Sequence, residues 1–343
     1  MKTLLNTLYV QTQGAWLRLD HDTVKVEVEG QLRLQVPLHH LGGLVLFGDV
    51  LCTPALLARC AADGRSVVWL SPAGRFQARL EGPVSGNVLL RRAQHEAHGH
   101  PGRSLAIARH LVAGKVKNLR HSLLRSAREA DSAQTEKPLR DAARLLADIL
   151  GNLPGAATLD ALRGLEGEAT RRYFAVFPHM IRGEQQFFVF NGRSRRPPLD
   201  PVNALLSFLY ALLLNDCVSA AQGVGLDPQV GFLHALRSGR PALGLDLMEE
   251  LRPVLADRLT LTLINRRQLK EEDFHLRPGG AVLLNDQGRK KVVVAYQERK
   301  QEEITHPLLN QKMPLGLVPH IQARLLARHL RGDLEAYPPY LHR

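Results

Sequence analysis

The chain has 343 residues, of which 45% are hydrophobic; this is enough to bury a sizeable core and excludes a largely disordered chain. Its 45 basic and 33 acidic residues give a formal net charge of +12. A surplus of that size indicates a polyanionic partner, and nucleic acid is the first candidate.

The cysteines and the N-terminus bear on where the protein acts. Cys52, Cys60 and Cys217 form no metal-spaced pair and are too few for a disulfide framework. The first residues, MKTLLNTLYV, lack the pattern of a signal peptide. No stretch approaches the roughly 18 apolar residues of a membrane span. We therefore expect a cytoplasmic protein without a membrane partner.

The first 80 residues show short alternations of apolar and polar side chains, typical of half-buried strands. The alternation runs over 16–19, 24–28 and 32–36, with turn residues between these stretches. Thr53 and Pro54 are typical of a helix N-cap and first helical position. We predict an antiparallel β domain with one helix over residues 1–85. Residues 1–90 carry eight basic and seven acidic groups, a net charge of +1.

The stretch EGPVSGN, residues 81–87, favours turns and marks a domain boundary, after which the apolar spacing becomes helical. Residues 86–343 are predicted to form a mostly α-helical domain, so the expected fold class is α+β. Residues 91–343 hold the remaining charge of +11. The predicted elements are helices over 139–150, 160–177, 201–221 and 304–329, a hairpin or a strand followed by a helix over 280–296, and a mobile tail over 330–343.

The predicted helical stretch 91–128 carries nine basic residues and a single acid, Glu96. Such a face is commonly only solvated, but the missing acids favour contacts with phosphates. Lys115, Lys117 and Arg120 are the candidates for DNA contacts on it.

The stretch GFLHALRSGRPALGLDLMEELRP, residues 231–253, places a histidine near acids in a basic protein. Asp246 and Glu249 are three residues apart, which puts both carboxylates on one face of a helix. We expect them in its first turn, where acids also simply complement the helix dipole. The turn at 238–241 can bring His234 back over this face, although a lone histidine beside apolar residues is more often a hydrogen-bonded core residue.

A metal site needs a third ligand, and Glu166 in GLEGEATRRYF is the best remaining candidate. Its flanking glycines, Gly164 and Gly167, would let another backbone approach closely. Arg171 and Arg172 follow within two turns as further candidates for DNA contacts. Oxygen and imidazole ligands without a thiolate suit Mg²⁺ or Mn²⁺ better than structural zinc. Such an ion would polarise a phosphodiester held by basic residues and activate a hydroxyl.

Six segments in a fixed order carry a resemblance to a known family. They are LCTPALLARCAADGRSVVWLSPAGRF, VAGKVKNLRHSLLR, GLEGEATRRYF, RRPPLDPVNALLSFLYALL, GLDPQVGFLHALRSGRPALGLDLMEELRP, and RKQEEITHP through HLRGDLEAYPPYL. They span almost the whole chain. The sequence resembles the first-numbered CRISPR-associated (Cas) proteins, the integrases of spacer acquisition, in the variety that accompanies type I-C systems.

The resemblance implies an N-terminal β domain joined to a helical catalytic domain. The metal ligands that it implies are Glu166, His234 and Glu249. It further implies that Asp246 tunes or assists this site. Asn203 and Tyr210 match family positions near the active site, although a capping Asn203 and a half-buried Tyr210 explain these residues equally well.

The activity that the resemblance implies is the integration of short DNA fragments into a CRISPR array, with Mg²⁺ or Mn²⁺ as cofactor. The 3′-hydroxyl of a fragment attacks a phosphodiester at the repeat boundary by transesterification, and water in its place gives endonuclease activity. The implied partners are double-stranded DNA with free 3′ ends, CRISPR repeat DNA, a second copy of the chain bound through the β domain, the small second-numbered Cas protein and a further adaptation nuclease.

Two alternatives stay open at this point. A stand-alone metal-dependent nuclease that cuts branched DNA in repair would use the same site. A non-catalytic DNA-binding scaffold would use only the basic helical domain.

Overall fold

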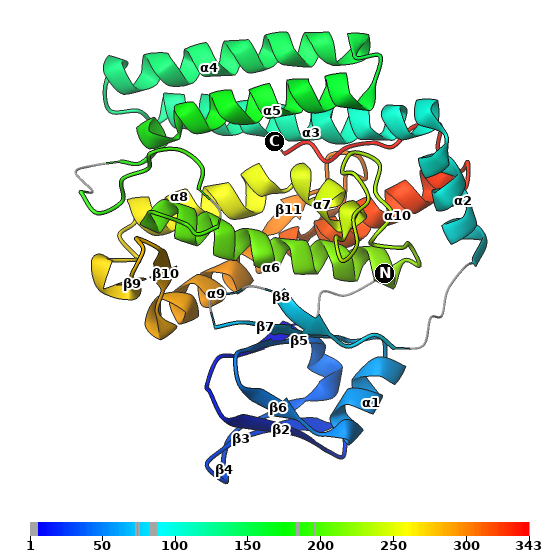
Figure 1. Ribbon diagram of the computed structural model, residues 1–343, viewed down its shortest axis with the longest axis vertical. Helices are drawn as coiled ribbons and strands as arrows, with labels where there is room; N and C mark the ends of the chain where they lie inside the picture. Colours follow the sequence, from blue (N-terminus) through cyan, green and yellow to red (C-terminus); the bar gives the residue numbers. More distant parts are fainter. Residues whose placement is uncertain are drawn as a thin grey trace.

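Strands dominate the first part of the chain and helices the rest (Figure 1). The computed structural model describes residues 6–72, 74, 76–82, 88–182, 186–194 and 196–342. The elements of the strand-rich part are β1 (Asn6–Val10), β2 (Ala15–Asp20), β3 (Thr23–Val28), β4 (Gln31–Pro37), β5 (Leu41–Phe47), β6 (Val50–Cys52), α1 (Pro54–Ala62), β7 (Ser66–Leu70) and β8 (Phe76–Arg79). Thr53 caps α1 as predicted, because its side chain accepts a hydrogen bond from the Leu56 N–H.

Two sheets share the core of the strand-rich part. Their strand orders are β1-β5-β7-β8 and β4-β3-β2-β6. Strand β5 contributes to two cores: Leu44 and Leu46 pack between the sheets with α1, whereas Val45 and Phe47 join the core of the helical part. Phe47 stacks on Phe208 of α6, with ring centroids 5.8 Å apart. The first sheet is therefore buried on both faces, and it connects the two parts of the molecule.

The prediction of an antiparallel β domain is only partly right. β2, β3 and β4 form antiparallel hairpins, and β8 runs antiparallel to β7. However, β1, β5 and β7 are parallel neighbours, and β6 is parallel to β2. The chain leaves the first sheet after β1 and again after β5, so each return crosses over instead of forming a hairpin. Side-chain alternation reports which face is buried and carries no information about strand direction.

The helical part is arranged around the long helix α3 and the buried helix α6 (Figure 1). Its elements are α2 (Val88–Gly99), α3 (Pro101–Arg128), α4 (Ala133–Asn152), α5 (Leu159–Ala175), α6 (Pro201–Gly223), α7 (Ala242–Glu249), the π-helical turn η4 (Arg252–Asp257), α8 (Arg258–Asn265), β9 (Phe274–Leu276), β10 (Val282–Leu284), α9 (Asp286–Gln301), β11 (Glu303–Thr305), β12 (Lys312–Pro314) and α10 (Val318–Leu330). A strand-rich region followed by a helical domain confirms the α+β fold class. The predicted boundary between residues 85 and 86 lies outside the described residues.

Two stretches near the C-terminus differ in how well they were predicted. Residues 280–296 are a strand followed by a helix, β10 and α9, which was one of the two expected arrangements. Residues 304–317 were predicted as helical, but they contain the antiparallel pair β11 and β12. Pro307 and Pro314 lack the N–H that a helix interior uses, so the helix begins only at Val318.

Helix α6 is long and apolar enough, among the described helices, to cross a membrane by length and composition. The expectation that no stretch approaches this limit is therefore wrong. In the structure 61% of the most apolar 18-residue stretch of α6 is buried. Leu205, Leu209 and Leu213 are inaccessible to solvent. This is the packing of a core helix. Its start is as predicted, because Asp200 accepts a hydrogen bond from the Asn203 N–H at 2.7 Å.

The predicted mobile tail is wrong for the residues that the structure describes. Tyr337 and Tyr340 are 0% and 1% exposed. The Tyr337 hydroxyl and the Tyr340 N–H donate to the carboxylate of Glu250, at 2.5 and 2.8 Å. Gly114 on α3 makes room for this contact, because a Cβ there would lie 2.8 Å from Pro339. Residues 334–342, called the C-terminal segment below, are therefore packed against the helical core.

Candidate functional site

The buried carboxylate of Asp246 on α7 holds the loop that carries His234. It accepts hydrogen bonds from the backbone N–H groups of Phe232 (2.5 Å), Leu233 (3.0 Å) and His234 (3.0 Å). Gly231 permits this approach, because a Cβ there would lie 2.7 Å from Asp246 Oδ2. Nδ1 of His234 lies 2.7 Å from Asp246 Oδ1. With the proton on Nδ1 donated to Asp246, Nε2 is left as an acceptor or metal ligand.

Asp246 and Glu249 share a face of α7, but they lie in its last turn instead of the predicted first turn. The helix begins at Ala242, directly after Pro241, so both acids fall at the end where the helix dipole disfavours a negative charge. Simple complementation of the dipole therefore does not explain them. Their charges need other partners, which are side chains from neighbouring elements.

Glu249 is surrounded by cationic groups. Its Oε2 lies 2.7 Å from Lys115 Nζ, and its Oε1 lies 3.0 Å from Arg252 Nη1 and 3.7 Å from His234 Nε2. Burial acts to raise the pKa of Glu249, but Arg252, Lys115 and His234 outweigh this and hold the pKa at about 2. Glu249 is therefore ionised at neutral pH although it is buried.

Lys115 on α3 joins the two glutamates of the site. Its Nζ pairs with Glu166 Oε1 on α5 as well as with Glu249 Oε2 on α7. Thr170 also donates to Glu166, at 3.0 Å. The Lys115 side chain is 3% exposed, so it lies inside the site and does not form the surface DNA contact that the sequence predicted. Folding thus brings Glu166 and Glu249 to one ammonium group, and the ring of His234 lies beside the second oxygen of Glu249.

No other described backbone packs against the glycines beside Glu166, contrary to the prediction of a close approach. A Cβ at Gly164 or at Gly167 would meet no atom within 4 Å. Glu166 is also the more accessible glutamate, with its side chain 23% exposed against 2% for Glu249. The site is therefore closed around Glu249 and open beside α5, where a ligand can approach.

The π-helical turn η4 supplies two residues that were not predicted, Arg252 and Asp257. The Arg252 guanidinium, paired with Glu249, lies over the Tyr210 ring at 4.8 Å, and Arg193 lies over the same ring at 5.1 Å. The Tyr210 hydroxyl donates to Asp257 Oδ1 at 2.6 Å. Burial raises the pKa of Asp257 to about 6, although Tyr210 and both arginines act against it. Arg252 could have been found from the sequence, because it lies three residues after Glu249. No comparable pattern in the sequence indicates Asp257.

Asn203 is buried and takes a structural role. Its Nδ2 donates to the Gly192 carbonyl at 2.7 Å and to Asp200 Oδ2 at 2.6 Å, and its Oδ1 accepts from the Ser194 N–H at 3.1 Å. These bonds hold residues 192–194 against the start of α6. The cap of α6 is Asp200 and, among the described residues, the Asn203 side chain bonds no backbone group of α6, so the capping interpretation of Asn203 does not fit. Tyr210 lies close to the site through Arg252.

The other predicted DNA contacts lie at or near the surface. Lys117 is exposed, and Arg120 donates to the Ala143 carbonyl at 3.2 Å. Arg171 and Arg172 both pair with Glu168, each at 2.6 Å. Contact of these four side chains with DNA stays a prediction.

The donor atoms of Glu166, His234 and Glu249 fit a hard divalent cation by type. Two carboxylates and one imidazole nitrogen are ligands that Mg²⁺ or Mn²⁺ accepts. Within the described residues, Glu249 Oε2 is a buried oxygen without a hydrogen bond, since its contact with Lys115 is an ion pair only. As they stand, no three described acidic, histidine or cysteine side chains are grouped closely enough to hold an ion. The ammonium group of Lys115 lies between Glu166 and Glu249, where a bound ion would lie.

Comparisons with known proteins agree with one another. A family model described as "CRISPR associated protein Cas1" matches residues 8–298. A "CRISPR-associated endonuclease Cas1 1" from Moorella thermoacetica is 60% identical over 343 residues, which cover 100% of both chains. Two solved structures share the fold. A "Casposase bound to integration product" has a TM-score of 0.84 at 20% identity, covering 99% of this chain and 95% of that chain. A "Cas6-RT-Cas1--Cas2 complex" has a TM-score of 0.83 at 23% identity, covering 99% and 36%.

Proposed function

Because the chain belongs to the Cas1 family of CRISPR-associated proteins, we propose that it is a divalent-metal-dependent DNA endonuclease and integrase. It joins the 3′-hydroxyl ends of short DNA fragments into a CRISPR repeat array. The observation that carries this proposal is that Glu166 and Glu249 share one ammonium group while His234 Nε2 lies 3.7 Å from Glu249 Oε1. The name of the Moorella relative and the fold shared with a casposase bound to an integration product support it.

Each side chain of the site has a definable task. The residues that would hold Mg²⁺ or Mn²⁺ are Glu166, His234 and Glu249. Asp246 keeps the proton of His234 on Nδ1 and so leaves Nε2 free. Arg252 fixes the Glu249 carboxylate by an ion pair, and Lys115 reduces the repulsion between the two glutamates.

The reaction exchanges one phosphodiester for another. When bound, the divalent ion would supply a Lewis acid that polarises the scissile phosphate. The incoming 3′-hydroxyl loses its proton as its oxygen bonds to phosphorus, the bond to the leaving 3′ oxygen breaks, and that leaving oxygen takes up a proton. Water as the attacking group gives cleavage instead. The charge of +11 on residues 91–343 serves to hold the DNA beside the acids.

The proposed partners follow from the family and from the surface. A fold-similar chain occurs in a Cas1–Cas2 complex, which supports the small second-numbered Cas protein as a partner. Trp16, Leu32 and Leu51 are 44%, 51% and 60% exposed on the second sheet, which supports a homodimer formed through the strand-rich part. Double-stranded DNA with free 3′ ends, CRISPR repeat DNA, an adaptation nuclease, a type I-C system and a cytoplasmic location complete the proposal.

The test uses labelled double-stranded DNA with free 3′-hydroxyls and a target that contains a CRISPR repeat, with Mg²⁺ or Mn²⁺ present. We expect wild-type protein to give labelled products joined at the repeat ends. Glu166→Gln and His234→Ala are expected to lose joining and cleavage by roughly 100-fold or more. Asp141→Asn, an exposed acid on α4, is the matched control and is expected to keep both activities.

Two other results would replace the proposal. DNA that is cut but never joined would favour a stand-alone nuclease acting on branched DNA. DNA binding without any cleavage or joining would favour a non-catalytic scaffold. Calorimetric titration with Mn²⁺ gives a readout independent of activity: wild-type protein should bind the ion, and Glu166→Gln should bind it at least about tenfold more weakly.

A further inference from the structure

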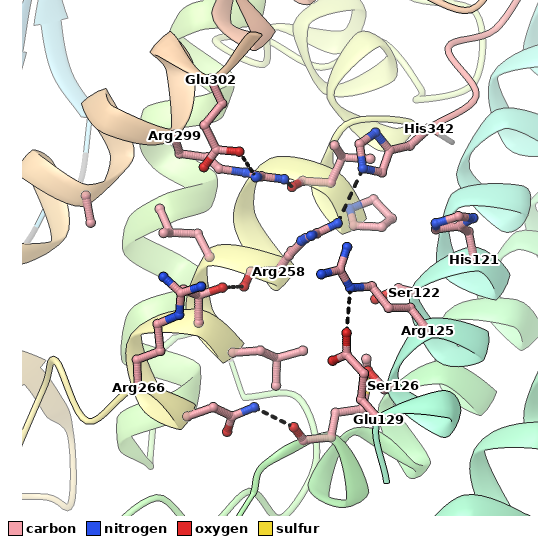
Figure 2. Close-up of a pocket in the computed structure, with 18 of the residues that line it drawn as sticks. His121, Ser122, Arg125, Ser126, Glu129, Arg258, Arg266, Arg299, Glu302 and His342 are labelled. Atoms are coloured by element: carbon pink, nitrogen blue, oxygen red, sulfur yellow. Dashed lines mark hydrogen bonds and ion pairs between the residues drawn. The ribbon is translucent and has the colours of Figure 1, made fainter. Parts of the chain in front are cut away.

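A polar cavity of about 540 Å³ lies beside the C-terminal half of α3, apart from the candidate metal site (Figure 2). Its walls come from α3, α8 and α9, and from His342 at the end of the C-terminal segment. On α3 the lining begins at Asn118, one turn beyond Lys115, and it continues to Glu129, the residue directly after the helix. The described lining residues include none of the candidate metal ligands. The cavity is therefore a second concave site.

Arginines outnumber acids in this cavity. The arginines are Arg125, Arg182, Arg258, Arg266 and Arg299, and the acids are Glu129, Glu298 and Glu302. Glu129 pairs with Arg125 and Arg182, and Glu302 pairs with Arg299. In the part of the chain that the structure describes, no carboxylate forms an ion pair with Arg258 or Arg266. The acids therefore neutralise the cavity only in part.

Arg258 lies at the centre of the cavity. Figure 2 shows it extending between Arg125 and His342, and its Nη1 lies 3.4 Å from His342 Nε2. Burial lowers the pKa of Arg258 to about 10, and the charges of Arg299 and Arg125 add to this effect. Burial and the nearby arginines also lower the pKa of His342 to about 4. The imidazole is therefore neutral at pH 7, and the arginines repel one another across the cavity.

We propose that this cavity binds a phosphate group, carried by a nucleotide or by a DNA strand, at a position separate from the catalytic site. Guanidinium groups recognise phosphate oxygens through paired, charge-assisted hydrogen bonds. A bound phosphate would neutralise the excess charge around Arg258. The volume is in the range of small-molecule sites, which suits one nucleotide and excludes a double helix. The inference goes beyond the proposed function and holds whether or not the protein joins DNA.

The experiment is calorimetric titration of the full-length protein without divalent metal. The probes are deoxyadenosine 5′-monophosphate, a short single-stranded oligonucleotide, and deoxyadenosine as the phosphate-free control. Arg258→Gln removes the central charge, and Arg144→Gln removes an equal charge from an exposed position on α4. We expect Arg258→Gln to weaken binding of a phosphate probe at least about tenfold, and Arg144→Gln to leave it near the wild-type value.

If Arg258→Gln binds the mononucleotide more weakly than wild-type protein does, a free nucleotide is the source of the phosphate. If Arg258→Gln binds only the oligonucleotide more weakly, the source is a DNA strand. Either outcome supports the site. Equal affinities of the two variants for both phosphate probes overturn it, and so does deoxyadenosine binding as tight as that of its monophosphate. If Arg258→Gln does not fold, Arg266→Gln, at an exposed position of the same cavity, replaces it with the same expectation. Joining of DNA is measured separately, so failure of this site leaves the proposed function standing.

Discussion

Lys115 controls the charge balance of the candidate site at the scale of single residues. Lys115→Met keeps most of the side chain and removes the ammonium between Glu166 and Glu249. We expect the metal-free variant to lose about 3–5 kcal/mol of stability in urea unfolding, because buried carboxylates are left without their cation. Added Mn²⁺ should restore part of this loss, since the ion would again neutralise the carboxylates. An equal effect of Mn²⁺ on the double variant Lys115→Met/Glu166→Gln would contradict a shared ion.

Glu250, next to Glu249 in sequence, makes the stability of the protein depend on pH. Burial raises the pKa of Glu250 from 4.5 to about 7, although hydrogen bonds from Tyr337, Tyr340 and Gln322 act against it. Between these two values the folded protein keeps a proton that the unfolded chain has lost. The stability contributed by this group is therefore complete below about pH 4.5 and is lost as the pH rises through about 7, a change of about 3 kcal/mol.

The measurement compares urea unfolding of wild-type protein and Glu250→Gln from about pH 5 to about pH 8. Because glutamine does not titrate, the difference in unfolding free energy isolates this group from the other acids. As the pH rises, the wild-type protein should lose unfolding free energy relative to Glu250→Gln. A difference that stays constant over this range would show that Glu250 titrates normally.

At the scale of elements, the glycine in the loop before α7 has no room for a side chain, whereas the glycine in helix α5 has. A Cβ at Gly231 would lie 2.7 Å from both Asp246 Oδ2 and the Ala242 backbone, whereas a Cβ at Gly164 meets open space. Gly231→Ala should therefore cost about 1–3 kcal/mol of stability and reduce activity, because Asp246 can no longer hold His234. Gly164→Ala should stabilise α5 by about 0.5–1 kcal/mol. Thermal unfolding of both variants measures these changes in stability. A similar loss of stability in Gly231→Ala and Gly164→Ala would be inconsistent with the open space beside Gly164.

The C-terminal segment acts as an element although it contains no helix or strand. Asn118 on α3 donates to the carbonyls of Glu250 and Tyr340, at 2.8 Å each, and accepts from the His342 N–H at 2.9 Å. Together with the bonds to the Glu250 carboxylate, these contacts fasten the end of the chain to the residue that follows Glu249. The C-terminal segment thus supports Glu250, the neighbour in sequence of the candidate metal ligand Glu249.

At the scale of the whole molecule, the distribution of charge separates the two parts. Residues 91–343 carry +11 and residues 1–90 carry +1. We expect DNA affinity to fall steeply with salt, because each neutralised phosphate releases counterions; six to ten contacts correspond to a loss of roughly 10³–10⁵-fold between about 50 and 200 mM salt. Fluorescence anisotropy over this range measures the slope. A flat response would exclude the basic helices as the docking surface.

Several features were predictable because they depend on short stretches of chain. The cap Thr53 and the starts of α1 at Pro54 and of α6 at Pro201 follow from local hydrogen bonding and helical periodicity, and all three are found in the structure. The approach of His234 to Asp246 was also predictable, because only a turn of four residues separates the loop from α7. The position of the acids within α7 was not, since it depends on where the preceding loop packs.

The sequence by itself determined the fold class, the starts of the capped helices and the residue types of the site, because periodicity, capping and side-chain chemistry act over a few residues. Only the tertiary structure decided the parallel pairing of β1, β5 and β7, the burial of the C-terminal segment and the place of Lys115 between Glu166 and Glu249. These features join residues far apart in the chain. The free energy that selects them comes from burial and charge pairing between elements, which no local pattern records.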